Sequence, residues 1–275
     1  MSAVEPEQLH HYCSPSTFLS IVLRKQFWLT SLTQSNDHAE GIWCLQQWLN
    51  AYQTKNHNLT YERRGAKEAA IASMRDHVAL GACFSEERDL LSQWRGYAAD
   101  GAGFSLTFRT HSLSRISREN RDGKALLDRV RYGQSDRSFL QAAFSDLYQA
   151  FRKDAQSYAE SNGTGSMSID NSIESRSLKR EAVTKLFLFK DGSFSEEKEW
   201  RILSVCPPQE ISGLEYRELR NVISPFLRLD FPPSSLTAVT LGPTNKTPDE
   251  IVKQLLYTNG FDCQVHRSRT PYQSR

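Results

Sequence analysis

The sequence lacks the patterns of disulfide-bonded, zinc-binding and membrane proteins. Its five cysteines are widely scattered and include no CxxC pair, which argues against a disulfide framework and against a cysteine zinc site. No stretch is long and apolar enough to span a bilayer, and the N-terminus has no basic leader followed by an apolar core. We therefore expect a cytoplasmic protein in a reducing compartment, with no membrane partner.

Common nucleotide-binding and hydrolase motifs are also missing. The chain contains no GxGxxG, P-loop, HExxH or GxSxG pattern. No motif therefore indicates a Rossmann dehydrogenase, a P-loop NTPase, a zincin or an α/β-hydrolase. Net charge is small as well, because 34 lysines and arginines stand against 32 acids. The molecule as a whole therefore favours neither nucleic acid nor acidic lipid.

One local stretch is basic. Between residues 109 and 137, seven arginines and Lys124 outnumber the acids. A solvated surface is the simpler interpretation, and a phosphate-binding surface is the alternative.

The composition is that of a globular protein. With 275 residues, of which 39% are hydrophobic and 24% charged, the chain fits one elaborated domain spanning 1–275. The polar, glycine-containing stretch 161–172 predicts a flexible loop within it.

Hydrophobic periodicity predicts mixed α and β structure with a largely antiparallel second half. Strands over 9–13 and 27–31 flank a helix that opens at Ser14-Pro15 and turns Phe18, Leu19, Val22 and Leu23 inward. Further strands are expected over 78–85, 103–108, 197–205, 215–222, 226–231, 236–241 and 261–266, and further helices over 90–94, 138–160, 173–189 and after Thr247.

Six motifs carry a family resemblance: LHHY at 9–12, FWLTSLTQSND at 27–37 with Glu40, ACFSEERDLLSQWRGY at 82–97, GAGFSLTF at 101–108, EEKEWRI at 196–202 and SRTPY at 268–272. In this order they resemble an uncharacterised bacterial family, domain of unknown function 2971. That resemblance names no activity.

A more distant resemblance suggests one. A first strand carrying histidine, then a helix and a strand with Thr and Ser, and a late strand with spaced glutamates look like the core of NAD-dependent ADP-ribosyltransferases. The resemblance implies an α+β fold with two small, largely antiparallel sheets around a cleft, flanked by helices, with NAD bound as substrate. It implies that His11 holds a ribose, that Tyr12, Thr30 and Ser31 frame nicotinamide, and that Glu199 steadies the reacting ribose.

The late glutamates suit that chemistry. If 197–203 is extended, Glu197, Glu199 and Arg201 point to one face. A carboxylate beside the sugar stabilises the positive charge that develops when the bond to nicotinamide breaks. We expect Glu199 to do this and Glu197 to orient or deprotonate the nucleophile, with repulsion raising one of their pKa values. A structural charge cluster is the alternative.

The strand over 78–85 should end near the cleft and place Ser85 there. Trp94, Arg95 and Tyr97 follow and could stack on nicotinamide or adenine. Packing under a loop explains these aromatics equally well, and a backbone-bonded histidine explains His10 or His11.

Three functions follow from these observations. The first is an ADP-ribosyltransferase-like or NAD-cleaving enzyme, an activity suited to a bacterial toxin or phage-defence effector, whose acceptor is a protein, nucleic acid, small molecule or water. The second is a metal-dependent nucleic-acid-processing or nucleic-acid-binding protein that uses the basic stretch and the acids near 37–40 and 86–89. The third is a non-catalytic interaction module. For the first function we expect no metal site.

Overall fold

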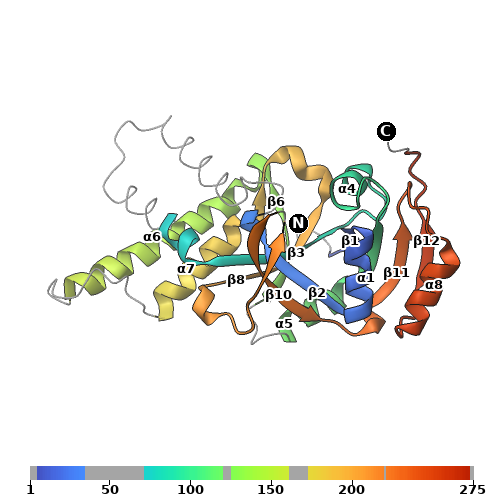
Figure 1. Cartoon of the computed structure of the whole chain (residues 1–275). Helices are drawn as coiled ribbons and strands as arrows, with labels where there is room; N and C mark the ends of the chain where they lie inside the picture. The colour runs from blue at the N-terminus through green and yellow to red at the C-terminus, as the bar shows by residue number, and fades with distance from the viewer. Residues whose placement is uncertain (1–4, 35–70, 120–124, 161–172, 220, 273–275) are drawn as a thin grey trace.

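Figure 1 shows the computed structural model of the chain, which describes residues 5–34, 71–119, 125–160, 173–219 and 221–272. The expected loop at 161–172 and the acids at 36–40 lie outside these residues.

Most described strands belong to one large sheet. The ten strands are β1 (Gln8–Cys13), β2 (Gln26–Ser31), β3 (Val78–Ser85), β4 (Phe104–Arg109), β5 (Ala125–Arg129), β8 (Glu199–Cys206), β9 (Glu215–Leu219), β10 (Val222–Asp230), β11 (Leu236–Leu241) and β12 (Gln264–Arg267). Their order is β12-β11-β4-β1-β3-β2-β10-β9, with β8 on β3 and β5 on β8. The short strands β6 (Arg131–Tyr132) and β7 (Phe189–Lys190) form a second, parallel pair.

Strand β3 joins two wings of the large sheet. One edge of β3 pairs with β8 along its whole length. Its other edge pairs with β2 at Gly81 and Leu80, and with β1 only at Ser85. One wing is β12-β11-β4-β1 and the other is β2-β10-β9. The expectation of two separate small sheets is therefore wrong, because β3 hydrogen-bonds to both wings and makes them continuous.

The described helices cover the sheet and its ends. They include α1 (Pro15–Arg24), α4 (Leu91–Tyr97), α5 (Thr110–Glu119), α6 (Arg137–Glu160), α7 (Ile173–Leu186) and α8 (Asp249–Thr258). Figure 1 shows α6 and α7 at one end of the molecule and α8 at the other. No described helix is both long enough and apolar enough to cross a membrane.

The first helix begins where the sequence predicts, with one correction to its buried side. Ser14 is the N-cap and accepts a hydrogen bond from the Thr17 N–H at 3.2 Å. Phe18, Ile21 and Val22 are buried, but Leu19 and Leu23 are 45% and 58% exposed. The prediction that these two leucines point inward is wrong, because positions 18, 21 and 22 lie on the side of α1 that packs on the sheet.

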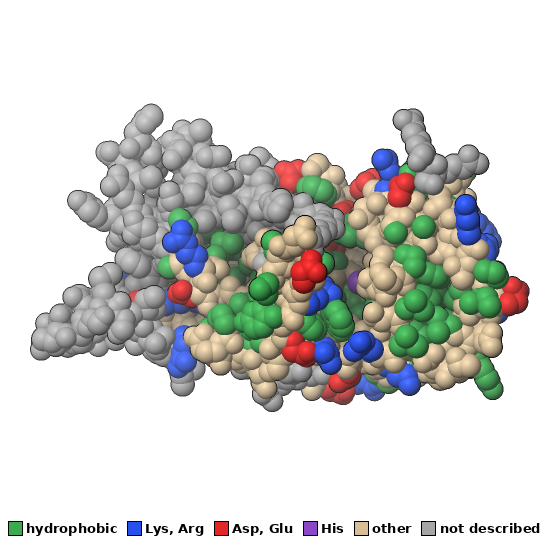
Figure 2. Space-filling view, viewed as in Figure 1, with side chains coloured by type: hydrophobic (Ala, Val, Ile, Leu, Met, Phe, Trp, Pro, Cys, Tyr) green, Lys and Arg blue, Asp and Glu red, His purple; other side chains and the backbone are tan. Residues whose placement is uncertain are grey.

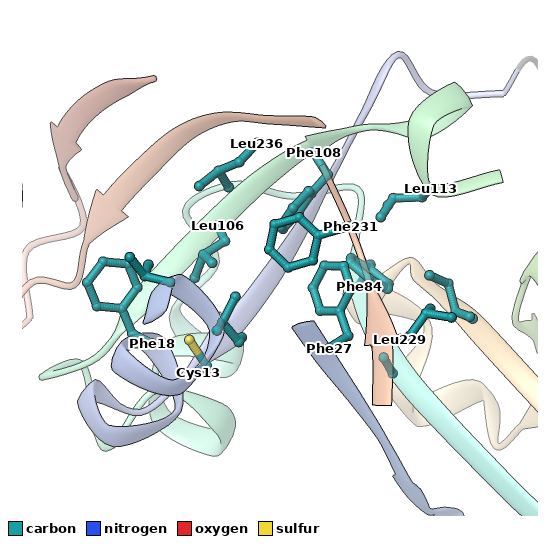
Figure 3. Close-up of a cluster of buried hydrophobic side chains, with 14 of the residues drawn as sticks. Cys13, Phe18, Phe27, Phe84, Leu106, Phe108, Leu113, Leu229, Phe231 and Leu236 are labelled. Carbon is teal, nitrogen blue, oxygen red and sulfur yellow. The ribbon is translucent and has the colours of Figure 1, made fainter. Parts of the chain in front are cut away.

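An aromatic core fills the space between the two wings. Phe27 of β2 lies 4.9 Å from Phe108 of β4 and 5.5 Å from Phe84 of β3, measured between ring centroids. Phe231 closes the group at 5.4 Å from Phe108 (Figure 3). All four rings are at most 4% exposed. We call the side of the sheet that carries Phe84 the core face.

The other side of β3 and β8 is covered by α7. Val183 and Phe187 pack there against Leu203 and Val205 of β8, and against Ala79. We call this side the α7 face. Because side chains alternate along a strand, every residue of the sheet can be assigned to one of the two faces from the strand register.

Candidate functional site

Four buried charged residues meet on the α7 face where β8 begins. The Lys190 Nζ of β7 lies 2.9 Å from Glu197 Oε2 and 2.7 Å from Glu199 Oε2. Arg201 holds Glu199 through two hydrogen bonds, Nε to Oε1 at 2.7 Å and Nη2 to Oε2 at 3.1 Å. None of the four is more than 8% exposed. We call Lys190, Glu197, Glu199 and Arg201 the ionic cluster.

The ionic cluster is balanced in charge. Two carboxylates face one ammonium and one guanidinium, so their mutual attraction offsets the cost of removing each from water. Arg201, at 1% exposed, also donates from Nη1 to the Phe187 carbonyl at 2.6 Å. This contact ties the cluster to the end of α7.

The two glutamates of the cluster have pKa values displaced in opposite directions. Burial alone would raise the pKa of Glu199, but the charges of Arg201 and Lys190 outweigh it and lower that pKa to about 2. Burial raises the pKa of Glu197 above its ordinary value, against the charge of Lys190. Paired carboxylates of which one is firmly ionised and the other more basic are typical of acid–base sites.

Two tyrosines border the cluster. Tyr97 of α4 donates its hydroxyl to Glu197 Oε1 at 3.4 Å and remains 43% exposed. Tyr132 of β6 accepts a hydrogen bond from the Glu199 N–H at 2.8 Å. Burial raises the pKa of both phenols, so both carry their proton at neutral pH. From the surface, Tyr97 is thus in direct contact with the more basic carboxylate.

The sequence predicts Glu197 on the strand, and the structure corrects this. Glu197 ends the 3₁₀ helix η3 (Gly192–Glu197), and Lys198 adopts a left-handed conformation with φ 42° before β8 begins. Alternation along a strand therefore explains only why Glu199 and Arg201 share a face. Glu197 joins them because Ser85 donates its hydroxyl to the Glu197 carbonyl at 2.7 Å and Lys190 binds its carboxylate.

Sequence reasoning did not identify Lys190 or Tyr132. A usable signal existed for the lysine, which ends the apolar run LFLFK at 186–190 and is 4% exposed. A lysine in that position needs a buried acidic partner. Tyr132 gave no comparable signal, because its role depends on the pairing of two short strands distant in sequence.

His11 does not share a face with the ionic cluster. Glu199 is directly opposite Ser85, and Ser85 is directly opposite His10, so these three side chains point to the α7 face. His11 points to the core face, where its ring lies 5.5 Å from Phe84 and 5.8 Å from Phe27. Its Nδ1 is 2.8 Å from the Cys83 carbonyl. The expectation that His11 and the glutamates line one cleft is therefore wrong on the strand register.

His10 occupies the α7 face but is held by the sheet. Its Nδ1 lies 3.0 Å from Thr107 Oγ1, and burial lowers its pKa to about 4. His10 is therefore neutral at physiological pH.

The stretch Trp94, Arg95, Tyr97 is divided between interior and surface. Trp94 is fully buried and packs edge-on against Tyr12 at 4.8 Å, so it has no free face for stacking on a base. Tyr12 is buried too, with its hydroxyl donating to the Glu87 carbonyl at 2.7 Å and accepting from the Leu90 N–H. Arg95 and Tyr97 are exposed. Packing in the interior explains why Trp94 and Tyr12 are aromatic. Of Tyr12, Trp94 and Tyr97, Tyr97 is the one whose side chain a ligand can reach.

Thr30 and Ser31 lie on opposite faces of β2. Thr30 is opposite Gly81 and half-buried, whereas Ser31 is buried on the core face with its hydroxyl 2.9 Å from Thr33 Oγ1. Among the described residues neither is hydrogen-bonded to the ionic cluster, so the structure does not bring the predicted nicotinamide frame together around Glu199.

Asp89 fastens the C-terminal segment to α4. Its carboxylate accepts hydrogen bonds from Trp94 Nε1 at 2.7 Å, Ser268 Oγ at 2.6 Å and the Arg269 N–H at 2.8 Å. Partial burial opposes ionisation, but these hydrogen bonds lower the pKa of Asp89 below 3.8. The SRTPY motif at 268–272 is thus explained by attachment to the helix that carries Tyr97.

We expect Asp89→Ala to lower the free energy of unfolding by about 1–2 kcal/mol, because four donors, including the Thr270 hydroxyl, lose a charged acceptor at a partly exposed site. Since the pKa of Asp89 is lowered, this stabilisation is present above pH 3.8 and is lost as the pH falls below it. Urea unfolding at pH 7 and at pH 3 measures both effects. Asp262→Ala, at an exposed aspartate, is the control; an equal loss in both variants would contradict the attachment.

The other acids near β3 are occupied by protein contacts. Glu86 accepts from Trp200 Nε1 at 2.9 Å, and Glu87 pairs with Lys198. Across the described ranges, no group of three His, Cys, Asp or Glu side chains is arranged to hold a metal ion. In the basic stretch, Arg129 and Arg131 pair with Glu86 and Asp128. Nothing in these contacts favours the metal-dependent interpretation.

A family model matches residues 93–202 of the chain, and its description reads "Protein of unknown function (DUF2971)". The chain is similar to that family over this stretch, which contains Tyr97, Tyr132 and the whole ionic cluster. The comparisons with curated proteins and with solved structures found no match. The comparisons therefore give no support to the resemblance to ADP-ribosyltransferases.

Proposed function

We propose that the chain is an NAD-cleaving enzyme, of the ADP-ribosyltransferase or NAD glycohydrolase class, whose reacting group is the Glu197 carboxylate. One observation carries this proposal. Glu199 is firmly ionised while its neighbour Glu197 has a raised pKa and contacts the partly exposed Tyr97. An acid whose pKa lies closer to neutrality is better suited to accept a proton during a reaction.

The chemistry needs one carboxylate at the sugar. The bond between ribose and nicotinamide breaks with both electrons going to the nicotinamide nitrogen, which leaves the ribose as a cation. The Glu197 carboxylate stabilises that cation and then takes the proton of the attacking hydroxyl or water as its lone pair forms the new bond. The products are free nicotinamide and an ADP-ribosylated acceptor, or free ADP-ribose when water attacks.

The roles of the two glutamates follow from their contacts. Both oxygens of Glu199 are held by the buried cations Arg201 and Lys190, whereas Oε1 of Glu197 accepts from the hydroxyl of the partly exposed Tyr97. Glu199 is therefore assigned a positioning role, which revises the expectation that it meets the ribose. Lys190 links the position of Glu199 to that of Glu197, since its ammonium binds both carboxylates at once.

Tyr97 and Arg95 are the proposed contacts for the substrate at the surface. The phenol of Tyr97 stays protonated, so it can donate to Glu197 or to a ribose hydroxyl. The exposed guanidinium of Arg95, two residues before Tyr97 on α4, is available to a phosphate of NAD.

Incubation of the purified full-length chain with NAD tests the proposal. Free nicotinamide and ADP-ribose are measured by liquid chromatography, with water as the acceptor. We expect release above the rate of NAD alone, rising with pH as Glu197 loses its proton. No release over hours at saturating NAD, with and without a cell extract as a source of acceptors, would remove the proposal.

A further inference from the structure

A row of arginines stacked on two aromatic rings lies on the wing β2-β10-β9. The rings of Trp28 and Phe226 are 4.8 Å apart. The Arg217 guanidinium lies 4.8 Å from the centre of Trp28 and 5.6 Å from that of Phe226. Arg24 lies 5.9 Å from Trp28, and Arg228 lies 5.9 Å from Phe226. We call Arg24, Arg217 and Arg228 the arginine row.

The strand register places this group on one side of the sheet. Phe226 is opposite Thr30, and Arg228 is opposite Trp28. In the next pair of strands, Arg217 is opposite Ser224. All these side chains therefore point to the α7 face of their wing. Figure 2 shows Lys and Arg side chains beside hydrophobic ones over β2 and β10.

The Nε of both Arg217 and Arg228 is buried without a hydrogen-bond partner, but only Arg228 has an acidic partner among the described residues. Arg228 Nη2 donates to Glu215 at 2.7 Å. Within the part of the chain that the structure describes, Arg217 has no acidic partner, and its buried Nε has no hydrogen bond. Arg217 is half-buried, and its guanidinium lies against the two rings, so water cannot surround it freely.

Ser224 adds a second donor at the same place. It is 0% exposed, and its Oγ has no hydrogen-bond partner among the described residues. Buried polar groups in folded proteins are nearly always hydrogen-bonded, and an exception calls for an ion, a water or a ligand. Two unpaired donors on directly opposed residues indicate one acceptor from outside the chain.

The charge of the surroundings indicates what that acceptor is. The three guanidiniums and the one carboxylate, Glu215, that touch the rings or each other give a net charge of 3 − 1 = +2. Asp230, the next acid on the same side of β10, is hydrogen-bonded to the neutral Gln26 and keeps its charge, so the surroundings remain positive, at +1, when it is counted. An anionic phosphoryl group matches this positive charge, and the planar fork of a guanidinium matches two of its oxygens.

We propose that Arg217 and Ser224 form a subsite for a phosphoryl group, flanked by Arg24 and Arg228. The Arg217 guanidinium and the Ser224 hydroxyl donate to phosphoryl oxygens, and the two flanking arginines balance the charge. The subsite is independent of NAD cleavage, because it involves neither the ionic cluster nor α4.

Isothermal titration of the full-length chain with inorganic pyrophosphate, and separately with inorganic phosphate, tests the subsite. Titrations are run at constant ionic strength, with acetate as the carboxylate control. We expect saturable binding of the phosphoryl anions and weaker binding of acetate. Arg217→Gln should weaken pyrophosphate binding ~10-fold or more, and Ser224→Ala ~3-fold, because each removes a donor to a charged oxygen.

Two further variants keep the test decisive. Arg115→Gln removes an exposed arginine of α5 that pairs with Glu119, and it should bind like the natural chain. Arg217→Lys retains the positive charge and most of the aliphatic stem, so it replaces Arg217→Gln in the test if that variant does not fold. Its affinity for pyrophosphate should lie between those of the natural chain and Arg217→Gln. Absence of saturable binding, or equal binding by the natural chain, Arg217→Gln and Ser224→Ala, would overturn the proposal and leave water as the acceptor.

Discussion

Replacing Arg201 by methionine is expected to lower the free energy of unfolding by about 3–5 kcal/mol. Methionine matches the length of the arginine stem, so the loss comes from the charge and not from a cavity. Glu199 would lose two hydrogen bonds and remain buried with Lys190 as its one cation among the described residues, which it shares with Glu197. The Phe187 carbonyl would also lose its donor. Equilibrium urea unfolding at pH 7 measures the loss.

The pH dependence of stability distinguishes this explanation from loss of packing. The pKa of Glu199 is lowered to about 2, so its ionised form stabilises the native chain above pH 4.5, and that contribution is lost as the pH falls towards 2. In Arg201→Met this acid-dependent loss should become smaller, since Arg201 is the larger of the two charges that lower the pKa of Glu199 and Lys190 remains. Arg115→Met, at an exposed pair, should change stability by less than about 0.5 kcal/mol. A similar small change in Arg201→Met would show that the ionic cluster does not depend on its guanidinium.

Changing Glu197 to glutamine is expected to lower the rate of nicotinamide release by about 10²–10⁴-fold, as is usual for loss of a proton-accepting group. Lys190 keeps Glu199 as a partner and the amide keeps an oxygen for it, so stability should change by less than about 1 kcal/mol. The informative result is this separation of rate from stability. Chromatographic assay of nicotinamide and urea unfolding of the same preparation measure the two.

Glu196→Gln is the matched control for that variant. Glu196 precedes Glu197 in the same 3₁₀ helix and is exposed, so it should retain the full rate. The pH profile adds a second criterion, because the rate of the natural chain should rise at a pH above 4.5, the ordinary value from which the pKa of Glu197 is raised. Equal rates in Glu197→Gln and Glu196→Gln would exclude Glu197 from the reaction.

Local patterns in the sequence predict the positions of the strands well, but they do not predict which strands pair with one another in the sheet. The strand over 78–85 and the strand over 236–241 coincide with β3 and β11, because both are apolar runs bounded by polar turns. That β3 pairs with β8 on one edge and with two different strands on the other depends on contacts between residues 49 to 128 positions apart. No local pattern carries that information. For this reason the sequence led us to expect two sheets where the structure has one continuous sheet.

In the candidate site, too, contacts set by local spacing could be predicted, and contacts set by strand pairing could not. The pairing of Glu199 with Arg201 follows from their spacing of two on a strand. The choice between His10 and His11 does not, because a shift of one residue in register exchanges the faces. Glu197 reaches the cluster through a 3₁₀ turn and Lys190 through a two-residue strand, and neither has a distinctive sequence period.

The pairing of β2 with β10 has a consequence for how the protein is made. Gln26 and Asp230 are hydrogen-bonded to each other although 204 positions separate them. During synthesis from the N-terminus, β2 is completed long before β10 leaves the ribosome, so the edge of β2 that pairs with β10 has no partner for most of that time. We therefore expect the nascent chain to acquire its native sheet late and to depend on chaperones until the last sixth of its length has emerged.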